Sequence, residues 1–218
     1  MDNSLQELWV VRAKVYGFLG SCILEPLQGD SSEVLKKNFG DNFPLLAANS
    51  HMESGLAELA KLSEKFGKSP LAIQEVQLEY TTLFLGPGLP KAPPWESIYR
   101  TQEKRLFGEP TYEVREVMAR NGFEGKGKNR QPEDHMGLEL ILLSAMAETL
   151  NTRSGSELAL ALREQLDFIV NHPLTWIADL HSDAAKHGDT GFYAALIKLI
   201  WGVLLWDKEL LEEVLAEM

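Results

Sequence analysis

Cysteine is almost absent from this chain of 218 residues, in which Cys22 is the only one. A single thiol cannot form an intramolecular disulfide, so the fold depends on packing, and a reducing compartment is favoured. Cys22 lies within an apolar run, and we interpret it as a small buried hydrophobe rather than a reactive group. One thiol is also too few for a structural zinc site built on cysteine.

Positive charge is scarce as well. The chain has 21 Lys and Arg residues against 32 Asp and Glu residues, which gives a formal net charge of -11. Nucleic acids and anionic lipid surfaces repel an acidic protein and select clustered Lys and Arg. The composition therefore argues against both partners and favours a cationic ligand or peptide.

Export and membrane signals are missing from the sequence. The residues after Met1 are acidic and lack a basic region followed by an apolar core, so we expect a cytoplasmic protein. The apolar segment from Phe192 to Trp206 is shorter than the roughly 20 residues that cross a bilayer, and it contains Lys198. We interpret this segment as a buried core helix.

Alternating apolar and polar residues, which are typical of strands, are nearly absent too. Apolar residues recur at three- and four-residue spacing, which predicts an all-α bundle of about eight or nine helices. The first helix should begin at a capping box of Ser4 and Glu7 and end before Glu25 and Pro26. A hydrophobic content of 44% is sufficient for one domain over 1–218. Within it we expect N-terminal helices in 1–85, a proline-rich hinge loop in 86–109 and C-terminal helices in 110–218.

Prolines interrupt the helical pattern between Tyr80 and Tyr99. Their fixed φ angles and missing N–H groups exclude both a helix and a central strand. The proline-rich segment ends in a large aromatic residue, Trp95, beside the carboxylate of Glu96. A rigid loop with an aromatic tip predicts a binding surface, and we expect irregular structure from Gly86 to Phe107.

A second group of polar residues follows Pro132. This proline suits the first position of a helix, which would place Glu133 and Asp134 in the first turn. The helix dipole disfavours a protonated His135, so we expect a neutral ring that donates one hydrogen bond and accepts another. His135 and Glu139 are four residues apart, a spacing that suits two metal ligands, although no other histidine completes a site.

Several spaced motifs resemble those of the TorD/DmsD/NarJ family of redox-enzyme maturation chaperones, in particular its TorD/DmsD branch. The resemblance is strongest from about Val76 to Trp176 and is looser in the C-terminal helices. The matching residues are Tyr80, Leu83, Phe84, Gly86, Pro87, Pro93 to Ser97, Tyr99, Phe107, Gly108, Thr111, Val114, Arg115, Pro132, Asp134, His135, Gly137, Glu139, Leu140, Phe168, His172 and Trp176.

This resemblance implies an all-helical cytoplasmic chaperone, not an enzyme, that assists a molybdopterin oxidoreductase. Its partners would be the apo-enzyme and the twin-arginine leader of that enzyme, which the chaperone binds before cofactor insertion and export. The resemblance implies no cofactor of its own and a monomer, with a domain-swapped dimer left open. The positions that match the family's leader-binding surface are Tyr80, Leu83, Phe84, Pro93, Pro94, Trp95, Gly108, Asp134 and His135.

The chemistry of such a leader adds three residues to this set. Two guanidinium groups followed by an apolar helix require carboxylates beside a hydrophobic groove. Glu96 and Glu133 can supply carboxylates along with Asp134, and Tyr99 can extend the apolar side. The basic loop from Gly125 to Arg130 could instead contact molybdopterin phosphate or a guanine nucleotide, although no P-loop pattern is present.

Other interpretations stay open from sequence alone. Leu83 and Trp95 could pack in the core, Asp134 could cap a helix, and His172 with Trp176 could be packing residues. Two alternative functions remain as well. One is a metal-dependent hydrolase that uses His135 and Glu139, and the other is a helical adaptor that promotes metal loading of another enzyme.

Overall fold

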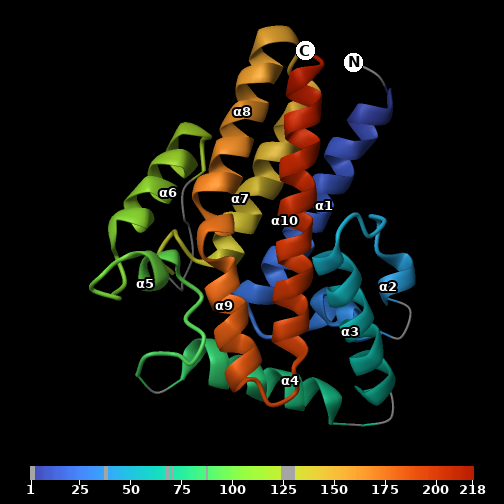
Figure 1. The fold of residues 1–218 in the computed structure, drawn as a ribbon, viewed down its shortest axis with the longest axis vertical. Coiled ribbons are helices and arrows are strands. Elements are labelled where there is room, and N and C mark those ends of the chain that lie inside the picture. The colour runs from blue at the N-terminus through green and yellow to red at the C-terminus, as the bar shows by residue number, and fades with distance from the viewer. Residues whose placement is uncertain (1–2, 37–38, 67–68, 70, 87, 124–130) are drawn as a thin grey trace. The chain divides into compact units, whose positions relative to one another are not determined.

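The computed structural model describes residues 3–36, 39–66, 69, 71–86, 88–123 and 131–218. Helices dominate this part of the chain, and no strand occurs in it apart from one isolated bridge between Trp95 and His135. The all-α prediction is therefore confirmed (Figure 1). The basic loop from Gly125 to Arg130 lies outside the described residues, so its contacts stay a prediction.

In the part of the chain that the structure describes, eight helices have nine residues or more, as the periodicity predicted. In chain order the helical elements are α1 (Asn3–Leu24), η1 (Gly29–Leu35), α2 (Phe39–Asn42), α3 (Ser50–Phe66), α4 (Ala72–Tyr80), η2 (Thr81–Leu85), α5 (Glu96–Arg100), α6 (Glu109–Arg120), α7 (Met136–Glu148), η3 (Thr149–Thr152), α8 (Gly155–Asn171), α9 (Pro173–His187) and α10 (Phe192–Ala216).

The residues group into two compact units that alternate along the chain. Unit 1 contains Met1–Leu24, Trp95–Trp176 and Asp207–Met218, and unit 2 contains Glu25–Pro94 and Ile177–Trp206. Each unit takes residues both from the expected N-terminal helices in 1–85 and from the expected C-terminal helices in 110–218. The expectation of one domain over 1–218 stays a prediction.

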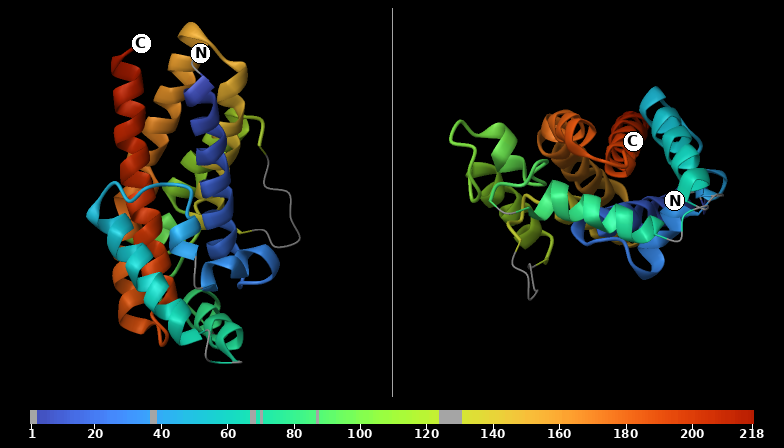
Figure 2. Two further views of the ribbon diagram at one scale, coloured as in Figure 1. Left: turned by 90° about the vertical axis from the view of Figure 1, so that its right-hand side faces the viewer. Right: turned by 90° about the horizontal axis from the view of Figure 1, so that it is seen from below.

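Unit 1 is built on the close packing of α1 against α7, which lie side by side (Figure 2). Two glycines permit this approach. A Cβ atom added to Gly20 would lie 2.9 Å from the carbonyl oxygen of Gly137, and one added to Gly137 would lie 2.9 Å from that of Gly20. Helix α1 ends at Leu24, directly before Glu25 and Pro26, as predicted.

A buried ion pair joins α1 to the C-terminal part of α10 within unit 1. The Arg12 guanidinium donates to both carboxylate oxygens of Asp207, with Nη2 at 2.8 Å from Oδ2. Tyr16 donates to the same carboxylate at 2.7 Å, and Arg12 also donates to Gln165 of α8 at 2.9 Å. Because both charges are fully buried, removing either partner would leave the other uncompensated.

Unit 2 holds the segment from Phe192 to Trp206, which is largely buried and begins α10, so the prediction of a core helix is confirmed. The buried Glu79 carboxylate accepts hydrogen bonds from the backbone N–H groups of Thr190 and Tyr193 and thereby caps the start of α10. Lys198 pairs with Glu58 at 2.9 Å. Within the described part of the chain, no helix has the length and apolar character that a membrane span requires.

Two local predictions were wrong. The helix after Pro132 begins at Met136 and not at the proline, because residues 132–135 form a turn in which the His135 N–H donates to the Pro132 carbonyl at 3.2 Å. The expected irregular stretch from Gly86 to Phe107 contains the short helix α5, because Asp134, distant in sequence, accepts from its first turn.

Candidate functional site

The residues predicted to bind a peptide divide between the two units. Unit 2 contains Tyr80, Leu83, Phe84, Pro93 and Pro94. Unit 1 contains the remaining members, which are Trp95, Glu96, Tyr99, Gly108, Glu133, Asp134 and His135.

The unit 2 members are all buried. Leu83 and Phe84 lie in η2, a single π-helical turn that ends where the Gly86 N–H donates to the Thr81 carbonyl at 2.8 Å. The rings of Tyr80 and Phe84 meet edge to face with centroids 5.1 Å apart. Both rings therefore contribute to the core of unit 2 and not to its surface in this conformation.

Other leucines of the same stretch are exposed instead. Leu78, Leu85 and Leu89 have exposed fractions of 66%, 49% and 63%. The sequence analysis missed these leucines because it chose Tyr80, Leu83 and Phe84 from the family motif. The seven-residue spacing of Leu71, Leu78 and Leu85 could have identified Leu78 and Leu85, but it does not include Leu89.

In unit 1, Trp95 and His135 join the two predicted motifs. They form the isolated antiparallel bridge, the Glu96 N–H donates to the Asp134 carbonyl at 3.0 Å, and the two rings lie edge to face at 5.7 Å. The sequence thus brings the proline loop and the Asp-His pair together as expected. Both Trp95 and His135 are buried, however, so the expected solvent-accessible surface is not formed by them.

His135 is a neutral helix cap. Its Nδ1 accepts a hydrogen bond from the Gly137 N–H at 3.0 Å, which requires an unprotonated nitrogen. Burial lowers the pKa of His135 to about 3. The hydrogen bond that Nδ1 accepts and the lowered pKa both favour the predicted neutral ring, and burial inside unit 1 is the cause of the lowered pKa.

Asp134 is fully buried and satisfies two donors from elsewhere in unit 1. Its Oδ2 accepts from the Ser97 N–H at 2.8 Å, which caps α5 from outside the helix. Its Oδ1 accepts from the Thr111 hydroxyl at 2.8 Å, which ties α6 to the same point. The carboxylate holds the two short helices together and presents no oxygen to solvent.

Glu96 is also fully buried and engaged within unit 1. It pairs with Arg100 one turn later on α5, and its Oε2 lies 3.0 Å from Nδ1 of His172. Tyr99 stacks on the buried Trp176 with ring centroids 5.5 Å apart. The packing interpretation of His172 and Trp176 agrees with this placement.

Glu133 is the predicted carboxylate nearest to solvent. The Arg115 guanidinium donates to it with two hydrogen bonds of 2.9 Å each, in the forked arrangement that arginine forms with carboxylates. Partial burial pushes the pKa of the Glu133 carboxyl upward, but the hydrogen bond and charge of Arg115 outweigh it and leave that pKa below its usual value.

Glu139 does not form the metal site that its spacing from His135 suggested. Burial, followed by the charges of Glu96 and Asp134, raises the pKa of Glu139 well above its usual value, which favours the protonated acid. His135 Nδ1 is occupied by the Gly137 N–H, and the described residues contain no group of three or more side chains suited to a metal ion. The geometry argues against a hydrolase built on these two residues.

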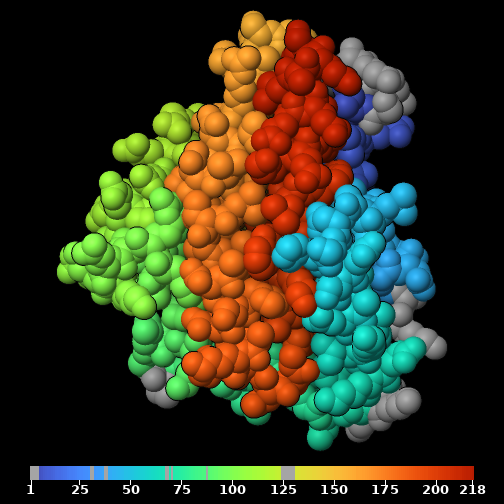
Figure 3. Space-filling view, viewed as in Figure 1, coloured from blue at the N-terminus to red at the C-terminus, as the bar shows by residue number. Residues whose placement is uncertain are grey.

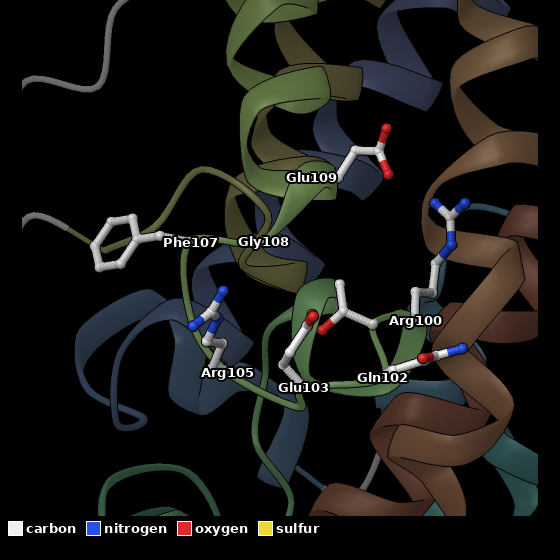
Figure 4. A pocket seen from close by; sticks show the side chains of 8 residues that line it. Arg100, Gln102, Glu103, Arg105, Phe107, Gly108 and Glu109 are labelled. Atoms are coloured by element: carbon white, nitrogen blue, oxygen red, sulfur yellow. The ribbon is translucent and has the colours of Figure 1, made fainter.

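An open pocket of about 430 Å³ lies on the α5–α6 segment of unit 1 (Figure 4). Gly108 is the one predicted residue that lines it, and a Cβ atom there would lie 2.9 Å from Thr101 Cγ2 and 3.0 Å from Ser97 Cβ. Phe107 is 54% exposed and turned away from the other lining residues. Sequence reasoning missed the charged lining residues, although all of them lie within seven residues of the Phe107-Gly108 motif. These are Arg100, Glu103, Arg105 and Glu109.

The C-terminal end of α6 contacts α8. Asn121, which follows α6, and Arg120, its last residue, both contact Glu164 of α8, at 3.2 Å and 3.5 Å. Figure 3 shows α6 at the molecular surface beside α8. The accessible part of the candidate site is therefore the α5–α6 segment together with Arg115 and Glu133.

Comparisons with known proteins cover nearly the whole chain. Residues 49–182 match the family model described as the nitrate reductase delta subunit. A protein of Vibrio cholerae named chaperone protein TorD is 28% identical over 98% of this chain and 99% of its own length. A TorD chaperone of Vibrio vulnificus is 24% identical over 92% of this chain and 94% of its own. The Tat proofreading chaperone DmsD of Salmonella typhimurium is 32% identical over 54% of this chain and 52% of its own.

Proposed function

Because this chain belongs to the nitrate reductase delta subunit family and is similar to proteins named TorD and DmsD chaperones, we propose that it binds the twin-arginine leader of a molybdopterin oxidoreductase in the cytoplasm. In this proposal it protects the apo-enzyme until the cofactor is inserted. The relatives are named as chaperones, and the chain is a chaperone of redox-enzyme maturation rather than an enzyme.

The observation that carries the proposal is the forked ion pair of Glu133. This carboxylate holds the guanidinium of Arg115 with two hydrogen bonds of 2.9 Å near the surface of unit 1. A leader arginine presents the same group, and lysine cannot form the same fork. The geometry supports a receptor that reads guanidinium groups in particular.

Exposed apolar side chains support binding of the apolar part of a leader. Leu106 and Phe107 offer such side chains on unit 1, the unit that also contains Glu133. An apolar helix binds other proteins by laying its apolar face against hydrophobic side chains. In the proposal, the Glu133 carboxylate selects an arginine and the apolar side chains add affinity.

Calorimetric titration with a synthetic leader peptide tests the proposal. The peptide with two adjacent arginines should bind, and a matched peptide with two lysines should bind at least about tenfold more weakly, because a charge-assisted hydrogen bond contributes about 1.5–3 kcal/mol. Glu133→Gln should bring the affinities for the two peptides close together, because the carboxylate that accepts the fork is lost. Glu213→Gln, which removes an exposed carboxylate of α10, serves as the matched control.

The result that would overturn the proposal is equal affinity for the arginine and lysine peptides, or no binding of either. A helical adaptor that does not recognise leaders would give this second outcome while still retaining its client in a pull-down. Thermal unfolding of each variant shows whether the fold is intact before affinities are compared.

A further inference from the structure

The two predicted carboxylates that hold guanidinium groups already have partners in this chain. Arg100 pairs with Glu96, and Arg115 pairs with Glu133. We infer that Arg115 is an internal stand-in for a leader arginine, and that a leader binds by displacing Arg115 from Glu133 while Arg100 stays on Glu96. This inference rests on the proposed function, because it specifies how the same site is regulated.

The two ion pairs flank one junction of the backbone. Glu96 and Glu133 are sequence neighbours of Trp95 and Asp134, and the Glu96 N–H donates to the Asp134 carbonyl at 3.0 Å. Asp134 itself is saturated by Ser97 and Thr111. Of the three acidic residues expected to receive arginines, Glu96 and Glu133 are therefore the ones that hold a guanidinium.

The two pairs differ in how readily they can open. The Arg115 and Glu133 side chains are 47% and 19% exposed, so water replaces their contacts when they separate. The Glu96 side chain is fully buried, and loss of Arg100 would leave its charge without a cation in a dry environment. Exchange is therefore confined to the Arg115 pair.

Arg115 has a second contact besides Glu133. While it is paired, its guanidinium also lies 5.2 Å from the ring centroid of Tyr112, one turn earlier on α6, and that ring is exposed. Contact with an aromatic face stabilises a guanidinium. A displaced Arg115 could therefore keep the ring contact after it loses its carboxylate.

Exchange has a consequence for affinity. Because one guanidinium replaces another, Glu133 is paired before and after an arginine ligand binds, and the net gain from the charge contact is small. A ligand that cannot form the fork, such as lysine, would replace Arg115 with a weaker partner. The cost of displacing Arg115 is the same for both ligands, so the stand-in lowers the affinity for arginine and for lysine and leaves the difference between them unchanged.

The test compares leader affinity in Arg115→Gln and in Arg163→Gln, which removes the same charge from an exposed site on α8. Removal of the competitor should tighten binding of the arginine peptide about two- to fivefold relative to Arg163→Gln, the range expected for an exposed ion pair. The gain should vanish in a Glu133→Gln background, where no carboxylate remains to be released.

The outcomes distinguish failure of the exchange from failure of the proposed function. If the unmodified protein binds no arginine leader, both the proposed function and the inference fall. If it binds, and Arg115→Gln changes affinity no more than Arg163→Gln or weakens it, the exchange is wrong and leader recognition stands. An equal gain in the presence and absence of the Glu133 carboxylate would also overturn the exchange, since it would reflect overall charge alone.

Discussion

Replacement of Asp134 by alanine should loosen unit 1, not remove a direct peptide contact. The carboxylate accepts from the Ser97 N–H and the Thr111 hydroxyl, both at 2.8 Å, and all three residues are buried. Each buried donor left without an acceptor costs about 1–3 kcal/mol, so the substitution should lower the unfolding free energy by about 2–5 kcal/mol. A domain with about 5–15 kcal/mol in total would lose a large fraction of its stability.

A graded series makes the reasoning quantitative. Asp134→Asn keeps one oxygen that can accept from Ser97 or Thr111, so it should cost roughly half as much as Asp134→Ala. Urea unfolding measures the free energies, and hydrogen exchange at the Ser97 amide reports the cap of α5 directly. Exchange at this amide should accelerate in step with the loss of stability.

Leader titration on the same variants decides between the two roles of Asp134. Where the fold persists, the loss of leader affinity should be no larger than the loss of folded protein and of helical structure in α5 explains. If Asp134→Ala abolished binding while the unfolding free energy changed by less than about 0.5 kcal/mol, the structural role would be refuted and a direct contact established.

Three further predictions concern the same unit. As the pH falls from the unfolded pKa of about 6.5 to the folded pKa of about 3, the unfolding free energy should decrease by up to about 1.4 kcal/mol per pH unit. The reason is that in this range His135 binds a proton only when the chain unfolds. His135→Asn, which can still accept from the Gly137 N–H, should remove this part of the pH dependence, and an unchanged slope would contradict it. Gly108→Ala should destabilise by about 1–3 kcal/mol in thermal unfolding, since its Cβ would meet Thr101 and Ser97 below 3.1 Å, and a neutral effect would show that the contact relaxes. The Cys22 thiol, whose pKa burial raises to about 12, should react with a disulfide reagent only after unfolding, so rapid reaction of the folded chain would show that it is accessible.

Helices were predictable because their signals are local. The three- and four-residue periodicity identified the all-α class, and the Glu25-Pro26 pair marked the end of α1 at Leu24. The start of α7 was misplaced because Pro132 is compatible with either a first helical residue or a turn, and the choice depended on bonds to distant residues. Local compatibility does not decide between two conformations that the same residue tolerates.

The sequence predicted which residues of the two motifs lie together at the candidate site, but it did not predict which of them are exposed to solvent. The proline loop and the Asp-His pair do meet, at the bridge between Trp95 and His135. Their carboxylates were expected to face solvent because charged side chains usually do, yet Glu96 and Asp134 are buried and fully engaged. The partners of Glu96 and Asp134 include His172 and Thr111, which are 76 and 23 residues away and which no local pattern connects to them.

The sequence alone determined the helical class, the family and the set of polar and aromatic residues gathered at one junction. Tertiary structure decided which of those residues are accessible, leaving Glu133 with Arg115 near the surface and placing Glu96 and Asp134 inside. The physical reason is that helix formation depends on neighbours within a turn or two, whereas the burial and pairing of a charge depend on which distant segments pack against it.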